Sequence, residues 1–189
     1  MPSRGRPSKK SHIIESAGQL FCELGYQGTS IDLVVQQAEV SKPTVYNNFP
    51  SKLVLYKAWQ TSELTRLLLE LDRWSLEWCD LQDVRDKKAT SLYWQSFYEH
   101  LFNDKAFLAI TRIVNGEPYK LNEDIRAPYQ SFLEDVRHGA ERHLMTTGEL
   151  SSDRSVVAQL AFQYCLSVHL LGVKPALDVD TMVNFKADQ

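Results

Sequence analysis

The sequence predicts an all-α fold, with an N-terminal helix-turn-helix domain of three helices followed by a larger helical domain. Apolar residues recur three and four positions apart through most of the 189 residues, the spacing of buried helix faces. Period-2 alternation, which marks strands, does not persist anywhere. Breaks fall at Gly116–Pro118, Gly148 and Pro175, and glycine is otherwise sparse.

The composition is that of an ordinary globular chain, with 43% hydrophobic and 24% charged residues. No apolar run approaches the ~20 residues of a membrane span, and the charged N-terminus lacks the apolar segment of a signal peptide. Three scattered cysteines, Cys22, Cys79 and Cys165, argue against a disulfide framework and a zinc site. We therefore expect a cytoplasmic protein that does not enter a membrane.

The first helix is expected over residues 11–24, with Gly25 as its stop. Its buried face is predicted to hold Ile13, Ala17, Leu20, Phe21 and Leu24. This helix would be the scaffold for the helix-turn-helix that follows.

Residues 30–49 predict two short helices joined by a tight turn. Ser30 is a suitable N-cap for the first helix, and Ser41 for the second. The turn falls at Glu39–Val40. In the second helix Val45 and Phe49 face inward, and the outward positions are Lys42, Thr44, Tyr46, Asn47 and Asn48.

The outward positions of this second helix carry hydroxyls, amides and a cation, and no carboxylate. Such groups suit phosphate oxygens and base edges, and a short helix presented after a tight turn is the helix-turn-helix arrangement. The pattern equally fits a solvated helix in a bundle, so periodicity alone leaves both interpretations open.

Charge is divided unevenly along the chain. Residues 1–52 hold six basic and four acidic side chains, a net charge of +2, whereas the remainder has a net charge of −5. Residues 1–10 form a basic arm in which Arg4 and Arg6 are candidates for the minor groove of A·T-rich DNA; a solubilising tail is the alternative. The asymmetry indicates that the N-terminal end faces DNA.

The stretch at residues 10–57 resembles the TetR family of bacterial transcriptional regulators. The resemblance lies in Gly25-Tyr26, the cap Ser30, Ala38-Glu39-Val40, the segment Ser41-Lys42-Pro43-Thr44-Val45-Tyr46-Asn47-Asn48-Phe49, and Ser51-Lys52-Leu53. It implies that bases are read by Lys42, Pro43 and Asn47. Phosphates would be held by Ser30, Thr44, Tyr46 and Lys52. The full set of expected DNA-binding residues is Arg4, Arg6, Ser30, Ser41, Lys42, Pro43, Thr44, Tyr46, Asn47 and Lys52.

Several residues depart from the family pattern. Glu39 replaces the turn glycine, which would cost about 1 kcal/mol if that position needs φ > 0. Asp32 stands where relatives often have a basic or neutral residue; it would repel phosphates, although a carboxylate accepts a hydrogen bond from cytosine N4. Asn47 and Asn48 replace an aromatic or histidine pair, so the bound sequence should differ from that of better-known relatives.

The expected domains are residues 11–55 for DNA binding and 56–189 for ligand binding and dimerisation. We expect a connecting helix from Ser51 to about Leu71, and helices near 83–103, 105–115, 122–146, 153–172 and 179–187. By the resemblance, the body encloses a small apolar or aromatic effector. The candidate pocket residues are Trp59, Trp78, Trp94, Phe97, Tyr98, Phe107, Tyr129 and Phe132. Simple core packing is the alternative for each of them.

The helix at 153–172 is apolar on more than one face, so it must be covered on both sides. The resemblance implies that it pairs with its copy in a homodimer; a central helix of a monomer is the alternative. The expected interface residues are Val157, Leu160, Tyr164, Val168 and Leu171.

No phosphate-binding glycine loop, zinc-protease motif, nucleophile elbow or Cys-x-x-Cys pair is present in the sequence. We therefore expect no enzyme, cofactor or metal. The predicted function is a ligand-responsive repressor that binds a near-palindromic double-stranded DNA site as a homodimer. The alternatives are a DNA-binding protein of this fold that acts through a protein partner, and a helical ligand carrier that has lost DNA binding.

Overall fold

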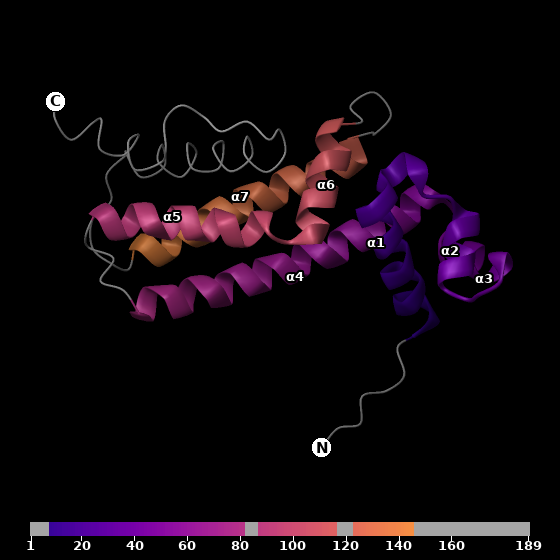
Figure 1. Ribbon diagram of the computed structural model, residues 1–189, viewed down its shortest axis with the longest axis horizontal. Helices are drawn as coiled ribbons and strands as arrows, with labels where there is room; N and C mark the ends of the chain where they lie inside the picture. Colours follow the sequence, from indigo (N-terminus) through magenta and orange to yellow (C-terminus); the bar gives the residue numbers. More distant parts are fainter. Residues whose placement is uncertain (1–7, 82–86, 117–122, 146–189) are drawn as a thin grey trace, which may run out of the picture. The chain divides into compact units, whose positions relative to one another are not determined.

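The computed structural model describes residues 8–81, 87–116 and 123–145. All the regular elements in these ranges are helices, as Figure 1 shows, which confirms the all-α prediction. None of the described helices is both long enough and apolar enough to cross a membrane. The elements are α1 (Lys9–Gly28), α2 (Ile31–Gln37), α3 (Lys42–Asn48), α4 (Lys52–Leu81), α5 (Lys87–Phe102), α6 (Lys105–Gly116) and α7 (Glu123–Met145).

Several predicted residues lie outside what the structure describes. These are Arg4 and Arg6, the helices expected at 153–172 and 179–187, and with them Val157, Leu160, Tyr164, Val168 and Leu171. The side chains of Trp78 and Trp94 also lie outside it.

The chain divides into two compact units. Of the described residues, the first unit comprises 8–64, 105–116 and 123–128, and the second comprises 65–81, 87–104 and 129–145. The helix α4 contributes its first part to the first unit and its remainder to the second. The functional boundary expected near residue 55 stays a prediction.

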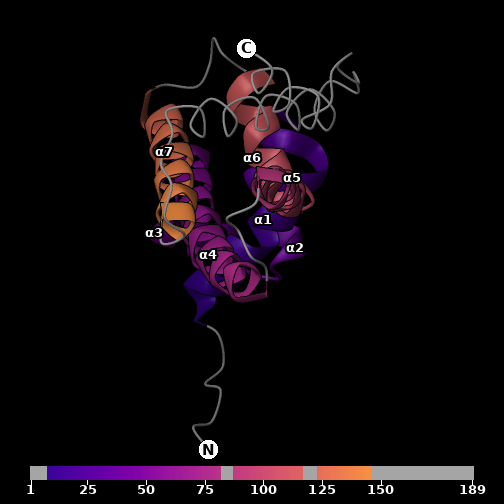
Figure 2. The same ribbon diagram turned by 90° about the vertical axis from the view of Figure 1, so that its left-hand side faces the viewer.

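The core of the first unit is built around an aromatic cluster contributed by α1 and α4. The ring of Phe21 lies 5.1 Å from that of Tyr56 and 5.3 Å from that of Trp59, and all three side chains are buried. Helix α6 packs against α1, as the two perpendicular views in Figures 1 and 2 show. Gln60, fully buried in this unit, donates a hydrogen bond from Nε2 to the Ile125 carbonyl at 3.0 Å.

Helix α1 bends near its end, and one prediction fails there. Gly25 adopts φ 70°, a conformation that glycine tolerates, and helical structure resumes to Gly28. Leu24, expected in the buried face, is 48% exposed. The prediction assumed that a regular helix continues through Leu24. The backbone leaves helical geometry at Gly25, so the packing of the turn that ends there no longer follows the helical period. The other four residues expected in that face, Ile13, Ala17, Leu20 and Phe21, are buried as predicted.

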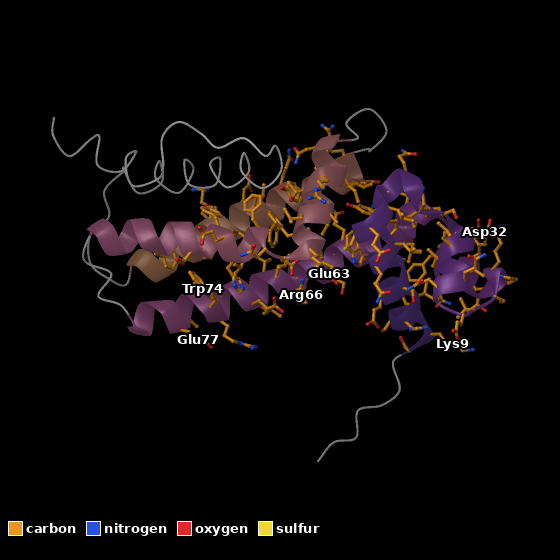
Figure 3. All side chains as sticks on the ribbon, viewed as in Figure 1. Lys9, Asp32, Glu63, Arg66, Trp74 and Glu77 are labelled. Carbon is orange, nitrogen blue, oxygen red and sulfur yellow. The ribbon has the colours of Figure 1, made fainter. Side chains whose placement is uncertain are left out.

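The second unit has its own aromatic cluster between α4 and α5. The ring of Trp74 lies 5.6 Å from Tyr93 and 5.7 Å from Phe97. The Tyr93 hydroxyl donates to Ser75 Oγ at 2.9 Å, which satisfies two buried polar groups. Arg66, which Figure 3 labels on α4, pairs with Asp104 just past the end of α5. The distance from Arg66 Nη2 to Asp104 Oδ2 is 2.7 Å.

Candidate nucleic-acid interface

The helices α2 and α3 begin at the side-chain caps expected from the sequence. Ser30 Oγ accepts a hydrogen bond from the Leu33 amide at 3.2 Å, and Ser41 Oγ accepts one from the Thr44 amide at 3.3 Å. Val34 and Val45 are fully buried beneath the pair. The predicted helix-turn-helix is therefore present, and a serine caps the N-terminus of each of its two helices.

The turn between α2 and α3 is closed by a pair of backbone hydrogen bonds. The amide of Val40 donates to the Val35 carbonyl at 3.2 Å, and the amide of Glu39 donates to the Gln36 carbonyl at 3.3 Å. This is the Schellman pattern, in which the first residue after the helix C-cap adopts the left-handed conformation. Glu39 occupies that place with φ 50°. It stands at the position where the family pattern has a turn glycine.

Glycine at position 39 should stabilise the first unit. Glu39→Gly removes the clash between a Cβ and the left-handed backbone, and we expect a gain of up to about 1 kcal/mol in the free energy of unfolding. Urea unfolding followed by circular dichroism measures it. Gln36→Gly is the matched control, because it introduces glycine at an ordinary helical residue three positions earlier and should lose about 1 kcal/mol. A loss of stability in Glu39→Gly would contradict the strain assigned to this turn.

The pair α2–α3 is anchored on α1 by polar contacts that the sequence did not reveal. His12 Nε2 lies 3.2 Å from the Ala38 carbonyl at the end of α2. Gln37 Nε2 donates to Gln19 Oε1 at 2.9 Å. Lys10 Nζ lies 5.8 Å from the centre of the Phe49 ring, at the end of α3. These contacts come from residues 18 to 39 positions apart, so no local pattern could have identified them.

The outward face of α3 exposes the residues expected to read DNA. Lys42, Pro43, Tyr46 and Asn47 are all exposed, with Tyr46 at 43%. Thr44 is half-buried and its Oγ1 lies 2.7 Å from Ser41 Oγ, so both hydroxyls already belong to the cap of this helix. The helix therefore presents a cation, an amide, a phenol and an apolar ring within one exposed face, which is a set of groups able to contact base edges and phosphates.

Asp32 in the first turn of α2 pairs with Lys42 in the first turn of α3. The Lys42 Nζ–Asp32 Oδ1 distance is 2.7 Å, and both side chains are exposed, at 51% and 70%. Figure 3 labels Asp32 on α2 beside α3. The hydrogen bond from Lys42 to Asp32 and the negative charge of Asp32 raise the pKa of Lys42 above its ordinary value. The sequence identified both residues but not their contact.

Lys52, expected to hold a phosphate, has close partners within the protein. Its Nζ donates to the carbonyls of Tyr26 and Thr29, each at 2.8 Å, and lies 4.4 Å from the centre of the Tyr26 ring. These carbonyls belong to the end of α1 and the link to α2. Lys52 therefore fastens the start of α4 to that link, and its role toward phosphate stays a prediction.

Removing the ammonium of Lys52 should weaken the fold in the absence of DNA. We expect Lys52→Met, which keeps an apolar stem, to lose about 1–2 kcal/mol in the free energy of unfolding, because two carbonyls lose a charged donor. Urea unfolding measures this loss. Lys57→Met is the control: its ammonium lies 3.5 Å from the exposed carboxylate of Asp124, a pair worth under about 1 kcal/mol. Equal stability of the two variants would show that the Lys52 bonds contribute nothing.

The residues expected to line a ligand pocket are divided between the two units. Trp59 and Phe107 lie in the first unit, and the other described candidates lie in the second: Phe97, Tyr98, Tyr129 and Phe132. All six side chains are buried. Trp59 is packed against Gly18 and the rings of Phe21 and Tyr56, so it also forms the core that supports the helix-turn-helix.

Comparison with protein families decides what this domain is. Residues 13–59, which run from α1 through the helix-turn-helix into α4, match the family described as bacterial regulatory proteins, tetR family. Over this domain the chain is similar to the TetR family. This confirms the resemblance inferred from Gly25-Tyr26 and the Ser41–Phe49 segment.

Two HTH-type transcriptional regulators match a part of the chain of similar length. The HTH-type transcriptional activator FasR of Mycolicibacterium smegmatis is 36% identical over 53 residues, 28% of this chain and 24% of its own. The HTH-type transcriptional repressor DhaR of a Mycobacterium species is 38% identical over 47 residues, 25% of this chain and 24% of its own. The match thus spans about a quarter of each of these relatives.

Similarity of fold extends over nearly the whole chain. The crystal structure of the transcriptional regulator FadR from Bacillus subtilis, solved in complex with stearoyl-CoA, superposes with a TM-score of 0.57. The superposition covers 92% of this chain and 93% of that one at 15% sequence identity, which shows a shared fold.

Proposed function

We propose that this protein is a sequence-specific transcriptional regulator that binds a near-palindromic operator as a homodimer and acts as a ligand-responsive repressor. The observation that carries the proposal is the α2–α3 pair, in which Val34 and Val45 are buried while Lys42, Tyr46 and Asn47 stand exposed on one short helix. In helix-turn-helix proteins such a helix enters the major groove.

We assign separate roles to the exposed residues of this interface. Lys42, Pro43 and Asn47 face bases, with Asn47 suited to the N6 and N7 atoms of adenine. Phosphates are held by Tyr46 and by the hydroxyls at the two helix starts, Ser30, Ser41 and Thr44. Lys52, whose ammonium also bonds to the carbonyls of Tyr26 and Thr29, adds a phosphate contact, and Arg4 and Arg6 enter the adjacent minor groove.

The effector in this proposal is a small apolar or aromatic molecule held by the helical body. The buried aromatic side chains of the second unit support it, because pockets for such ligands are lined mainly by apolar and aromatic groups. The bound stearoyl-CoA of the Bacillus subtilis regulator is consistent with an apolar ligand for this fold. A ligand that prefers one arrangement of the two recognition helices shifts the dimer away from the spacing of successive major grooves.

Selection of bound duplexes from random DNA tests the proposal. The full chain is used at near-physiological salt, and the enriched pool is sequenced. We expect an inverted repeat, since a two-fold dimer reads a two-fold site. A pool without an enriched sequence, together with binding that disappears steeply as salt rises, would leave only backbone affinity and would overturn the proposal.

A further inference from the structure

The Asp32–Lys42 pair is placed where it can contact a base pair. It joins the first turn of α2 to the first turn of α3, with 2.7 Å between Lys42 Nζ and Asp32 Oδ1, and both side chains are largely exposed. An exposed ion pair of this kind contributes at most about 1 kcal/mol to stability, so the fold does not depend on it. The pair sets a charged donor beside a charged acceptor on the surface that carries Pro43 and Asn47.

A G·C base pair offers the complementary pattern in the major groove. Guanine presents two acceptors, N7 and O6, and the cytosine beside them presents the N4 donor. Lysine donates to guanine and aspartate accepts from cytosine N4, and these are separate, well-defined pairings. An ammonium and a carboxylate held side by side therefore match the two halves of one G·C pair.

We propose that Asp32 and Lys42 read a single G·C base pair in each half-site as one unit, with Lys42 donating to guanine and Asp32 accepting from cytosine N4. This inference rests on the proposed DNA-binding function. It also explains why a carboxylate is tolerated at the DNA-facing end of α2. On unrelated DNA the carboxylate repels the phosphates and holds Lys42 in a neutral pair, whereas on the correct base pair both charges gain partners.

The contact has a consequence for binding to unrelated DNA. With Asp32 in place, Lys42 adds little net positive charge to the interface, so it releases few counterions. Removing the carboxylate frees the cation for a phosphate. We therefore expect Asp32→Ala to bind unrelated DNA a few-fold more tightly and to steepen the dependence of log K on log salt by about one.

The test is the same random-duplex selection, run with the full chain and with variants at position 32. The unsubstituted protein should enrich an inverted repeat with one invariant G·C pair in each half-site. Asp32→Ala should keep the rest of that repeat and lose the preference at that pair, so that an affinity ratio of roughly tenfold or more between G·C and A·T duplexes falls to about one. Asp32→Asn should move the preference toward A·T, since an amide reads adenine N6 and N7.

Glu23→Ala is the matched control, because it removes another exposed carboxylate, from α1, and should leave the preference unchanged. Circular dichroism verifies that each variant is folded. An unaltered G·C preference in Asp32→Ala, or a loss of preference at every position, would overturn the reading assigned to this pair while leaving the proposed function standing. A pool from the unsubstituted protein with no enriched sequence would overturn both.

Discussion

Replacing Lys42 and Tyr46 together with alanine should abolish operator binding while the protein stays folded. Both side chains are exposed on α3, so their removal opens no cavity in the core. Single contacts to bases or phosphates are worth about 1–3 kcal/mol, so the loss of two should weaken binding on the order of 100-fold or more. Fluorescence anisotropy with the selected duplex measures the affinity, and sedimentation measures the assembly state, which we expect to be unchanged.

The matched control for that double variant is Lys105→Ala with Leu24→Ala. It also removes one exposed cation and one half-exposed apolar side chain, from α6 and α1. We expect operator affinity within about threefold of the unsubstituted protein, because neither residue lies on α2 or α3. Retained operator binding by Lys42→Ala with Tyr46→Ala would show that the assigned face of α3 is wrong.

Truncation of Trp59 should have the largest effect on stability. The indole is 2% exposed and packs on Phe21, Tyr56 and Gly18. Trp59→Ala removes the indole and leaves a cavity in the core. Such truncations lower the free energy of unfolding by about 3–5 kcal/mol. Because the indole supports α1 beneath the helix-turn-helix, we expect the variant to unfold at a lower urea concentration and to bind DNA more weakly.

The contact between Gly18 and Trp59 can be isolated by a double-mutant cycle. A Cβ added to Gly18 would contact the indole Nε1 and lie 2.6 Å from its Cδ1, so Gly18→Ala alone should cost about 1–2 kcal/mol. In the Trp59→Ala background the new methyl enters the vacated space, and that cost should vanish. Gly116→Ala is the control, since an added Cβ there has no neighbour within 4 Å. An equal cost of Gly18→Ala in both backgrounds would contradict the packing described for this pair.

Much of the helix-turn-helix domain could be predicted because its determinants are local. Ser30 and Ser41 cap helices through bonds three residues away, and Val34 and Val45 follow the helical period. The left-handed turn at Glu39 was also foreseeable, because a two-helix turn of this length needs one such residue.

The features that the sequence could not predict depend on residues brought together from separate helices. Lys52 bonds to carbonyls 23 and 26 positions earlier in the chain, and Lys42 pairs across the turn with Asp32. Helical periodicity carries no information about such contacts. The exposure of Leu24 could not be predicted for a different reason: the sequence does not show that the helix bends at Gly25, directly after Leu24.

Two copies of α3 are proposed to enter major grooves on one face of a near-palindromic site. A hydroxyl-radical footprint on the selected duplex tests this arrangement. We expect two protected segments related by the dyad of the repeat, with centres one helical turn or a whole number of turns apart. Methylation of guanine N7 within these segments should prevent binding, because N7 lies in the major groove. A single protected segment, or uniform protection that does not depend on sequence, would contradict it.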